Sequence, residues 1–133
     1  MSQENVEIAR RHRDAFNRRD MEAFLEALDR DVEWIPIMAP LEGSIYRDHH
    51  GVQRWIEELD AYWETFEVRD ENLYDLGDRV LILGHWRARG RASGVVLENQ
   101  PAAWLYEIKD GKVVRLRTYT DRAEALEASG LSE

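Results

Sequence analysis

The chain has 133 residues, no cysteine and a formal charge of −9 at pH 7. Its length fits one domain, residues 1–133, and its 44% hydrophobic and 34% charged residues are typical of a folded globular protein. The lack of cysteine excludes disulfides, thiolate nucleophiles and Cys-ligated metal centres, and the acidic excess disfavours binding to nucleic acid or to anionic membranes.

Three helices are predicted in the N-terminal half. Ser2 can cap the first, which has an apolar face at helical spacing and His12 beside that stripe. Asp20 can cap a second, shorter helix. The third shows the clearest i, i+3, i+4, i+7 pattern, formed by Val52, Trp55, Ile56, Leu59, Tyr62, Trp63 and Phe66. These helices have one apolar side each and therefore need a sheet or another helix to cover it.

Most of the strands are predicted in the C-terminal half. A short strand over 32–37 ends near Pro36, and the loop after it, with Leu41, Ile45 and Tyr46, can form the lip of a pocket. Further strands are expected over 68–76, 79–92, 102–109 and 112–120. The last two flank Asp110–Gly111, a strong hairpin signal, so the sheet is predicted to be antiparallel. A short helix over 122–128 closes the chain.

This order of elements predicts the α+β class, with three helices packed on one face of a curved antiparallel sheet. The strand over 102–109 has apolar residues on both faces, with Trp104 and Tyr106 on one side and Leu105 on the other. Because the second face also needs cover, a homodimer through the sheet is expected.

Several segments spread over nearly the whole chain form one recognisable pattern: 15–20 with Phe24, 31–34, 46–47 before Gly51–Val52, 110–114, and 119–121 followed by 124–126. In these segments the chain resembles the nuclear transport factor 2-like superfamily, especially its SnoaL-like and ketosteroid-isomerase-like branch. The resemblance implies a cone of curved sheet and helices around a deep cavity, and often a dimer. The superfamily includes isomerases, cyclases, hydrolases and non-catalytic binding modules, so it does not imply one reaction.

The catalytic groups of ketosteroid isomerases are not matched. Their first tyrosine aligns with His12, their base with Trp34 or Ile35, and their later aspartate with Trp104. Glu33 should point away from a cavity that Trp34 lines, because neighbouring strand residues face opposite sides. The epoxide hydrolase triad is also missing, since Arg87 and Arg89 have no aspartate two residues later.

SnoaL-type cyclases imply an aspartate near the end of the last strand, and Asp121 is the matching candidate here. The alternative for Asp121 is a helix cap, because Glu124 follows three residues later, as in a capping box. Asp121 and His12 are therefore the candidate catalytic residues. His12 has a structural alternative as well, as a buried histidine without a chemical role.

The expected function is binding of a small apolar molecule, polycyclic, polyketide-like or terpenoid-like. An enzyme of this kind would be a cofactor-independent isomerase, cyclase or dehydratase, and one alternative is a non-catalytic ligand-binding or protein-interaction module. A further alternative is an interior that the aromatic side chains fill completely, without a pocket. His85 and Arg87 are either polar contacts to the ligand or solvated charges. The residues expected to bind the substrate are Trp34, Trp55, His85, Arg87, Trp104 and Tyr106.

No cofactor or metal is predicted. The chain has no nucleotide-binding glycine motif, and the pair His49–His50 lacks the spacing of a metal site. No apolar run approaches the roughly 18 residues of a membrane span, and the first residues do not resemble a signal peptide. A cytoplasmic protein that binds neither membranes nor nucleic acid is therefore expected.

Overall fold

The computed structural model describes residues 2–36 and 45–131. The predicted end of the first strand at Ile37 and the predicted pocket lip at Leu41 lie outside these residues. The described helices are α1 (Ser2–Arg18), α2 (Met21–Glu26), α3 (Asp48–Tyr62) and α4 (Arg122–Ala128). The described strands are β1 (Leu28–Ile35), β2 (Tyr46–Arg47), β3 (Trp63–Asp75), β4 (Arg79–Gly90), β5 (Val96–Lys109) and β6 (Lys112–Tyr119).

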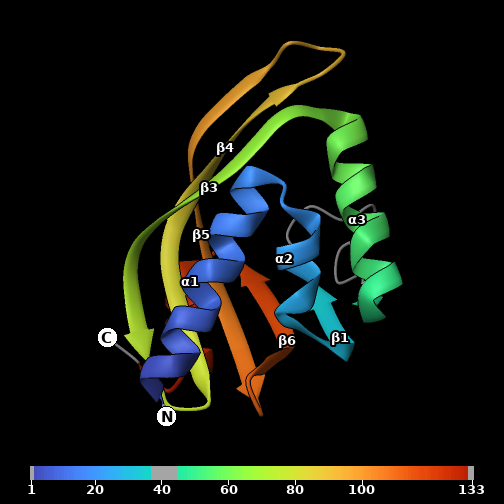
Figure 1. Ribbon diagram of the computed structural model, residues 1–133. Coiled ribbons are helices and arrows are strands. Elements are labelled where there is room, and N and C mark those ends of the chain that lie inside the picture. Colours follow the sequence, from blue (N-terminus) through green and yellow to red (C-terminus); the bar gives the residue numbers. More distant parts are fainter. Residues whose placement is uncertain (1, 37–44, 132–133) are drawn as a thin grey trace.

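The strands form one sheet in the order β2-β1-β6-β5-β4-β3. Helices α1, α2 and α3 lie on one side of this curved sheet, so the predicted α+β arrangement is confirmed (Figure 1). Two details of the prediction are wrong. The sheet does not close into a cone, because β2 and β3 form its two edges. It is also not purely antiparallel, since β1 pairs in parallel with β6, with Trp34 opposite Leu116.

The main hydrophobic core lies between these three helices and the sheet. It is rich in aromatic side chains, which α1, α2, α3 and the long strands all contribute: Phe16, Phe24, Trp34, Tyr46, Trp55, Trp63, Phe66, Trp86, Trp104 and Tyr106. Such rings each bury a large apolar area and interact edge-on or stacked with their neighbours. The core therefore holds α1, α2 and α3 on the sheet.

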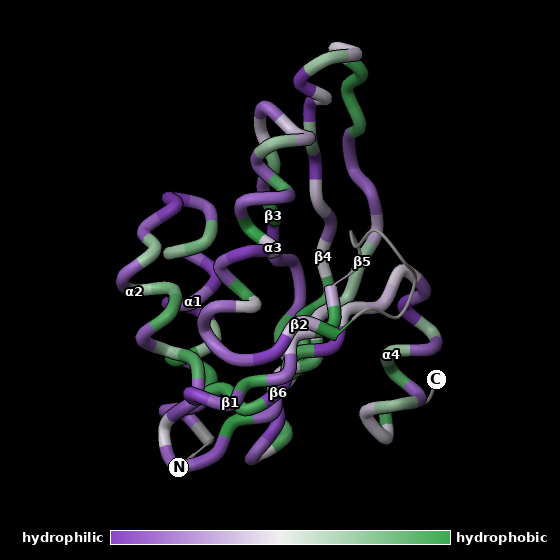
Figure 2. The backbone as a smooth tube through the Cα atoms, turned by 90° about the vertical axis from the view of Figure 1, so that its right-hand side faces the viewer, coloured by the Kyte–Doolittle hydropathy of each residue, from purple (hydrophilic) through white to green (hydrophobic). Residues whose placement is uncertain are grey.

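The opposite face of the sheet has its own apolar cluster, and α4 covers it. Leu81, Leu83 and Leu105 are buried there against Ala125 of α4. Figure 2 shows α4 on the far side of the sheet from α1 and α2. The apolar second face that the sequence indicates is thus covered, at least here, by the chain's own last helix.

The boundary between α3 and β3 differs from the prediction. The helix begins at Asp48 and ends at Tyr62, so Trp63 and Phe66 belong to the strand and not to the helix. The pairing of β3 with β4 shifts register between Trp63 and Thr65, and both aromatic side chains are buried although they are three residues apart. A bulge that inserts one residue turns the strand in this way and imitates a helical spacing.

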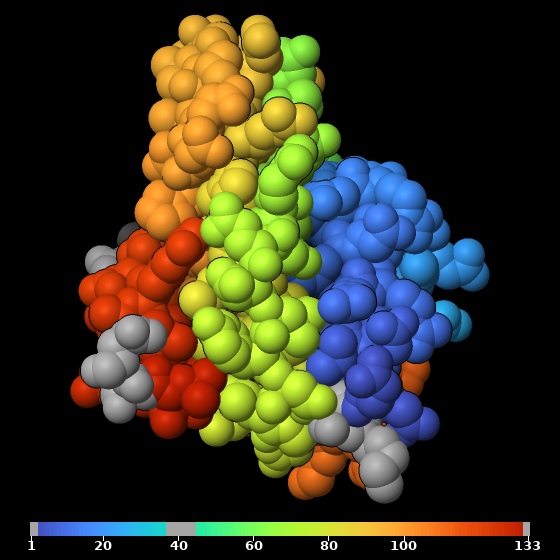
Figure 3. Space-filling model, turned by 90° about the vertical axis from the view of Figure 1, so that its left-hand side faces the viewer, coloured from blue at the N-terminus to red at the C-terminus, as the bar shows by residue number. Residues whose placement is uncertain are grey.

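The hairpin of β4 and β5 extends beyond the helices as an arm (Figures 1 and 3). Its second strand begins at Val96, earlier than the predicted Ala102, because Arg89 and Val96 still pair. Val95 and Val96 are about half exposed. At the other end of β5, Asp110 and Gly111 both have positive φ, at 51° and 79°, as the predicted tight hairpin turn requires.

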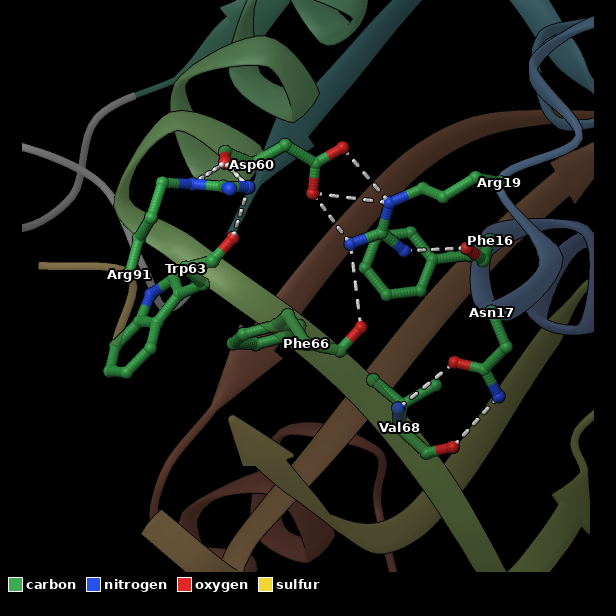
Figure 4. A network of polar contacts seen from close by, with 8 residues as sticks. All are labelled: Phe16, Asn17, Arg19, Asp60, Trp63, Phe66, Val68 and Arg91. Atoms are coloured by element: carbon green, nitrogen blue, oxygen red, sulfur yellow. Dashed lines mark hydrogen bonds and ion pairs between the residues drawn. The ribbon is translucent and has the colours of Figure 1, made fainter. Parts of the chain in front are cut away.

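Polar contacts fix the end of α1 on the edge strand β3 (Figure 4). The Asn17 side chain donates to the Val68 carbonyl and accepts from the Val68 amide, at 2.9 and 3.0 Å. Arg19 pairs with Asp60 of α3 at 2.9 Å and donates to the Phe66 carbonyl. Figure 3 shows β3 with α1 on one side and α4 on the other. The Asn17 side chain of α1 and the Arg19 side chain that follows the helix therefore satisfy part of the open edge of the sheet.

None of the helices described over 2–36 and 45–131 is long and apolar enough to cross a membrane.

Candidate functional site

An interior cavity lies between α1 and the sheet, inside the main core. It leaves about 40 Å³ in which the centre of a water-sized molecule can move. Its wall comes from every layer of the fold and is mostly aromatic: His12, Arg13, Phe16, Phe24, Trp34, Pro36, Trp55, Phe66, Val68, Trp86, Trp104, Tyr106, Leu116 and Thr118. The predicted residues His12, Trp34, Trp55, Trp104 and Tyr106 thus meet around one space.

His12 is held in this wall by aromatic rings and one hydrogen bond. Its ring stacks on Phe24 at 4.1 Å between centroids and meets Trp34 edge-on at 5.5 Å. Its Nδ1 lies 3.0 Å from the Tyr106 hydroxyl. Burial, with a smaller effect of the neighbouring Arg13 charge, lowers the pKa of His12 to about 3. The imidazole is therefore neutral at physiological pH.

The proton on His12 follows from the hydrogen bonds of Tyr106. Burial raises the pKa of Tyr106, so the phenol keeps its proton. The acceptor within reach of this proton is His12 Nδ1, so the Tyr106 hydroxyl donates to it. The reverse arrangement leaves the buried phenol proton without a partner. The neutral imidazole therefore carries its own proton on Nε2.

Three buried nitrogens of the cavity wall have no hydrogen-bond partner among the described residues: His12 Nε2, Trp34 Nε1 and Arg13 Nη2. The last is in an ion pair with Asp70, whereas His12 Nε2 and Trp34 Nε1 have no such contact among these residues. Trp34 is placed by β1, whose alternation turns its indole towards the helices and turns Glu33 to the opposite face, where Glu33 pairs with Arg47 at 2.8 Å. A buried N–H without a partner costs about 1 to 3 kcal/mol. Two such groups in one cavity mark a place where an acceptor is missing.

Arg13 places a positive charge at the edge of the cavity. Its side chain is 6% exposed, and its Nη2 lies 2.6 Å from Oδ1 of Asp70 on β3. The guanidinium also lies over the Trp104 ring, with 3.8 Å between Cζ and the ring centroid. Ion pairing and the cation–π contact compensate for the loss of water around this charge. No carboxylate belongs to the described cavity wall itself.

His85 and Arg87 lie outside the cavity. The side chain of His85 bonds Glu71 at 3.1 Å, and Arg87 bonds Glu67 at 2.8 Å. Arg122 also donates to Glu71, and this bond more than that of His85 holds the pKa of Glu71 below its ordinary value. The two predicted residues therefore form polar contacts with the edge strand, beside an open groove at β3.

Asp121 also lies away from the cavity. It is exposed at the start of α4, where its carboxylate accepts from the amides of Ala123 and Glu124 at 2.9 and 3.4 Å. The capping contacts of Asp121 thus belong to the surface of the fold.

Among the described residues, no group of three or more His, Asp or Glu side chains is arranged to hold a metal ion.

Sequence reasoning missed several residues of the cavity wall. Arg13 follows Ala9 by four residues and precedes Phe16 by three, so helical spacing already placed it on the buried face. Trp86 alternates with His85 and Arg87 on the same strand, and it faces the cavity while they face away. Strand alternation was therefore the available signal, and it favours Trp86 over its two charged neighbours.

The fold is shared with many solved structures. A nuclear transport factor 2-like protein of unknown function from Burkholderia pseudomallei is 24% identical, with a TM-score of 0.80 over 93% of this chain and 95% of that one. TerC, co-crystallised with polyporic acid, is 21% identical, with a TM-score of 0.78 over 96% and 98%. A ketosteroid-isomerase-like protein from Catenulispora acidiphila, in complex with trimethylamine, is 20% identical, with a TM-score of 0.74 over 94% and 93%.

These identities are low, so the three structures establish the architecture alone. No curated protein matches the chain. The model of the SnoaL-like domain family matches residues 9–116, which include every cavity-lining residue except Thr118. The chain belongs to the SnoaL-like domain family.

Proposed function

We propose that the protein binds a small, mainly apolar molecule in the interior cavity. The observation that carries this proposal is the cavity wall, in which aromatic rings from α1, α2, α3 and four strands surround a space with few polar groups. Walls of this composition are typical of small-molecule sites. The bound polyporic acid and trimethylamine of two structurally similar proteins are in keeping with it.

The size of the cavity favours a small ligand. A water molecule needs roughly 10 to 15 Å³ of such space, so about 40 Å³ accommodates only a few non-hydrogen atoms. A compound with one ring requires a modest displacement of the wall. The polycyclic, polyketide-like or terpenoid-like ligands expected from the sequence require the aromatic cluster to move apart. One-ring compounds are therefore the first choice for a screen.

The environments of the two candidate catalytic residues, Asp121 and His12, support binding better than acid/base catalysis. Asp121 is a helix cap on the surface, and His12 has a pKa of about 3, so it does not exchange protons readily near neutral pH. A cofactor-independent isomerase, cyclase or dehydratase would therefore need another proton carrier. Tyr106 is the remaining candidate in the described wall, and burial raises its pKa.

A homodimer through the sheet remains a proposal. Its sequence argument was the apolar second face of the sheet, and α4 covers Leu81, Leu83 and Leu105 on that face. The charged pairs Arg47–Glu33 and Arg87–Glu67 are also exposed, and a dimer that covered them would have to keep them paired. Light scattering of the purified protein at several concentrations tests this proposal directly.

A thermal-shift screen with a cavity-filling variant tests the binding proposal. A ligand at 100 times its dissociation constant adds about 2.7 kcal/mol, which raises the midpoint of a domain of this size by roughly 5 to 10 °C. The variant Val68→Phe puts a ring into the cavity and should abolish the shift. The matched control Val96→Phe adds the same ring on the exposed arm and should keep it. Equal shifts in both variants would place the ligand elsewhere.

A further inference from the structure

His12 Nε2 and Trp34 Nε1 line the cavity without an acceptor among the residues that the structure describes. Trp34 Nε1 can only donate, and His12 Nε2 carries the proton that the bond between Tyr106 and His12 Nδ1 leaves on it. The two rings meet edge-on with their centroids 5.5 Å apart, and both line the same cavity. An acceptor atom of a ligand that lies within reach of both nitrogens would receive both hydrogen bonds.

The surroundings define the charge of that acceptor. No carboxylate lines the described wall, and the Arg13 guanidinium at its edge makes the cavity favourable for negative partial charge. The charge of Arg13 is already paired with Asp70 at 2.6 Å, so it is not free to neutralise a buried anion. Removing a carboxylate from water without a counter-ion is costly. A neutral molecule with a strongly polar oxygen fits these conditions best.

We infer that the ligand of this cavity is a neutral carbonyl compound, whose oxygen accepts hydrogen bonds from His12 Nε2 and Trp34 Nε1 while its apolar part packs among the aromatic rings. This inference rests on the proposed binding function and names its ligand class. In it, Tyr106 is a positioning residue, because it holds His12 in the tautomer that donates from Nε2. A hydrocarbon ligand offers no acceptor atom to the two donors.

A pair of ligands with nearly the same shape tests the inference. Cyclohexanone and methylenecyclohexane differ in the exchange of a carbonyl oxygen for a CH₂ group, and methylenecyclohexane cannot accept a hydrogen bond. Calorimetric titration of the full chain should give at least about tenfold tighter binding of the ketone, because each donor contributes a net hydrogen bond. Equal affinities within about twofold would overturn the carbonyl inference and leave the binding proposal standing. Failure of both ligands to bind would count against both.

Two tryptophan variants separate donor loss from ring loss. Trp34→Phe removes one N–H and should reduce the preference for the ketone to about threefold. Trp86→Phe is the matched control, because Trp86 also lines the cavity but its nitrogen is not among the unpartnered buried atoms. The control should keep the tenfold preference, whatever its absolute affinity. An equal loss of preference in the two variants would assign it to packing and contradict the inference.

The infrared spectrum of bound ¹³C-labelled cyclohexanone measures hydrogen bonding to the carbonyl oxygen itself. A purely structural role of Trp34 would not change this C=O frequency. Hydrogen bonds to the oxygen lower the C=O stretching frequency, so the bound ketone should absorb below its position in an apolar solvent. Trp34→Phe should remove part of this shift and Trp86→Phe none. A bound carbonyl band at the apolar-solvent position would show that the oxygen lies away from both donors.

Discussion

The Arg13 guanidinium lies over the Trp104 ring, 3.8 Å from Cζ to the ring centroid, while its Nη2 contacts Asp70 at 2.6 Å. These contacts join α1, β3 and β5 at one point of the cavity wall. The arginine is almost fully buried, whereas Asp70 is about one third exposed. Water reaches little of the Arg13 guanidinium, so Asp70 has to compensate its charge. The stability of the folded protein therefore depends on both partners of the pair.

Asp70→Asn should destabilise the protein by about 1 to 3 kcal/mol, because it leaves the buried Arg13 cation without its counter-ion. Urea unfolding measures the change. A double-mutant cycle with Arg13→Met should give a coupling of about 1 kcal/mol or more, whereas additivity within about 0.5 kcal/mol would contradict the account. Glu67→Gln, which breaks the exposed pair with Arg87, is the control and should change stability by less than about 1 kcal/mol.

The low pKa of His12 predicts a pH dependence of stability. In the folded protein the pKa is about 3, against an ordinary value of 6.5, so the unfolded chain takes up this proton first as the pH falls. The contribution of His12 to the free energy of unfolding is fully present above pH 6.5. It is lost between pH 6.5 and 3, at about 1.4 kcal/mol per pH unit. Urea unfolding between pH 7 and 4 follows this loss.

Histidine variants isolate that contribution from the other titrating groups. His12→Phe keeps a ring against Phe24 and removes the proton site, so the difference in stability between wild type and variant should shrink as the pH falls. His50→Gln changes a histidine on the surface and serves as the control. A His12 whose ¹⁵N ring signals titrate near pH 6 in the folded protein would refute the neutral imidazole.

Asp121 is predicted to stabilise α4 without touching the ligand. Asp121→Ala should cost about 1 kcal/mol, since two amides of the first turn lose their acceptor, and Asp121→Asn should cost less because asparagine also caps helices. Both variants should bind cyclohexanone like the wild type. Loss of a measurable turnover in Asp121→Asn at unchanged stability would assign the residue to catalysis instead.

The sequence predicts much of the architecture because its signals are local. Helical spacing, the order of elements and the Asp110–Gly111 turn suffice for the α+β class and for the last hairpin. The parallel pairing of β1 with β6 is a long-range contact without a local signal. The bulge near Trp63 cannot be predicted from the sequence either, because two buried aromatic residues three positions apart are equally compatible with a helix.

The sequence predicts apolar residues of the cavity wall, but it does not predict the charged residue Arg13 there. Trp34, Trp55, Trp104 and Tyr106 were expected in its wall and line it. His85 and Arg87 were grouped with them for their polarity, although alternation along β4 gives them the opposite face from Trp86. Arg13 was overlooked because arginine is usually solvated, and its burial depends on Asp70, which lies 57 residues away.

Contacts between protein and ligand protons provide the most direct test of the central claim, the small-molecule site in the core. An isotope-filtered nuclear Overhauser spectrum of the labelled protein with unlabelled cyclohexanone reports which side chains lie next to the ligand. The account predicts contacts to Phe24, Trp34 and Leu116 of the cavity wall, and their loss in Val68→Phe. Contacts confined to exposed side chains such as Tyr62, Val95 and Val96 would contradict it.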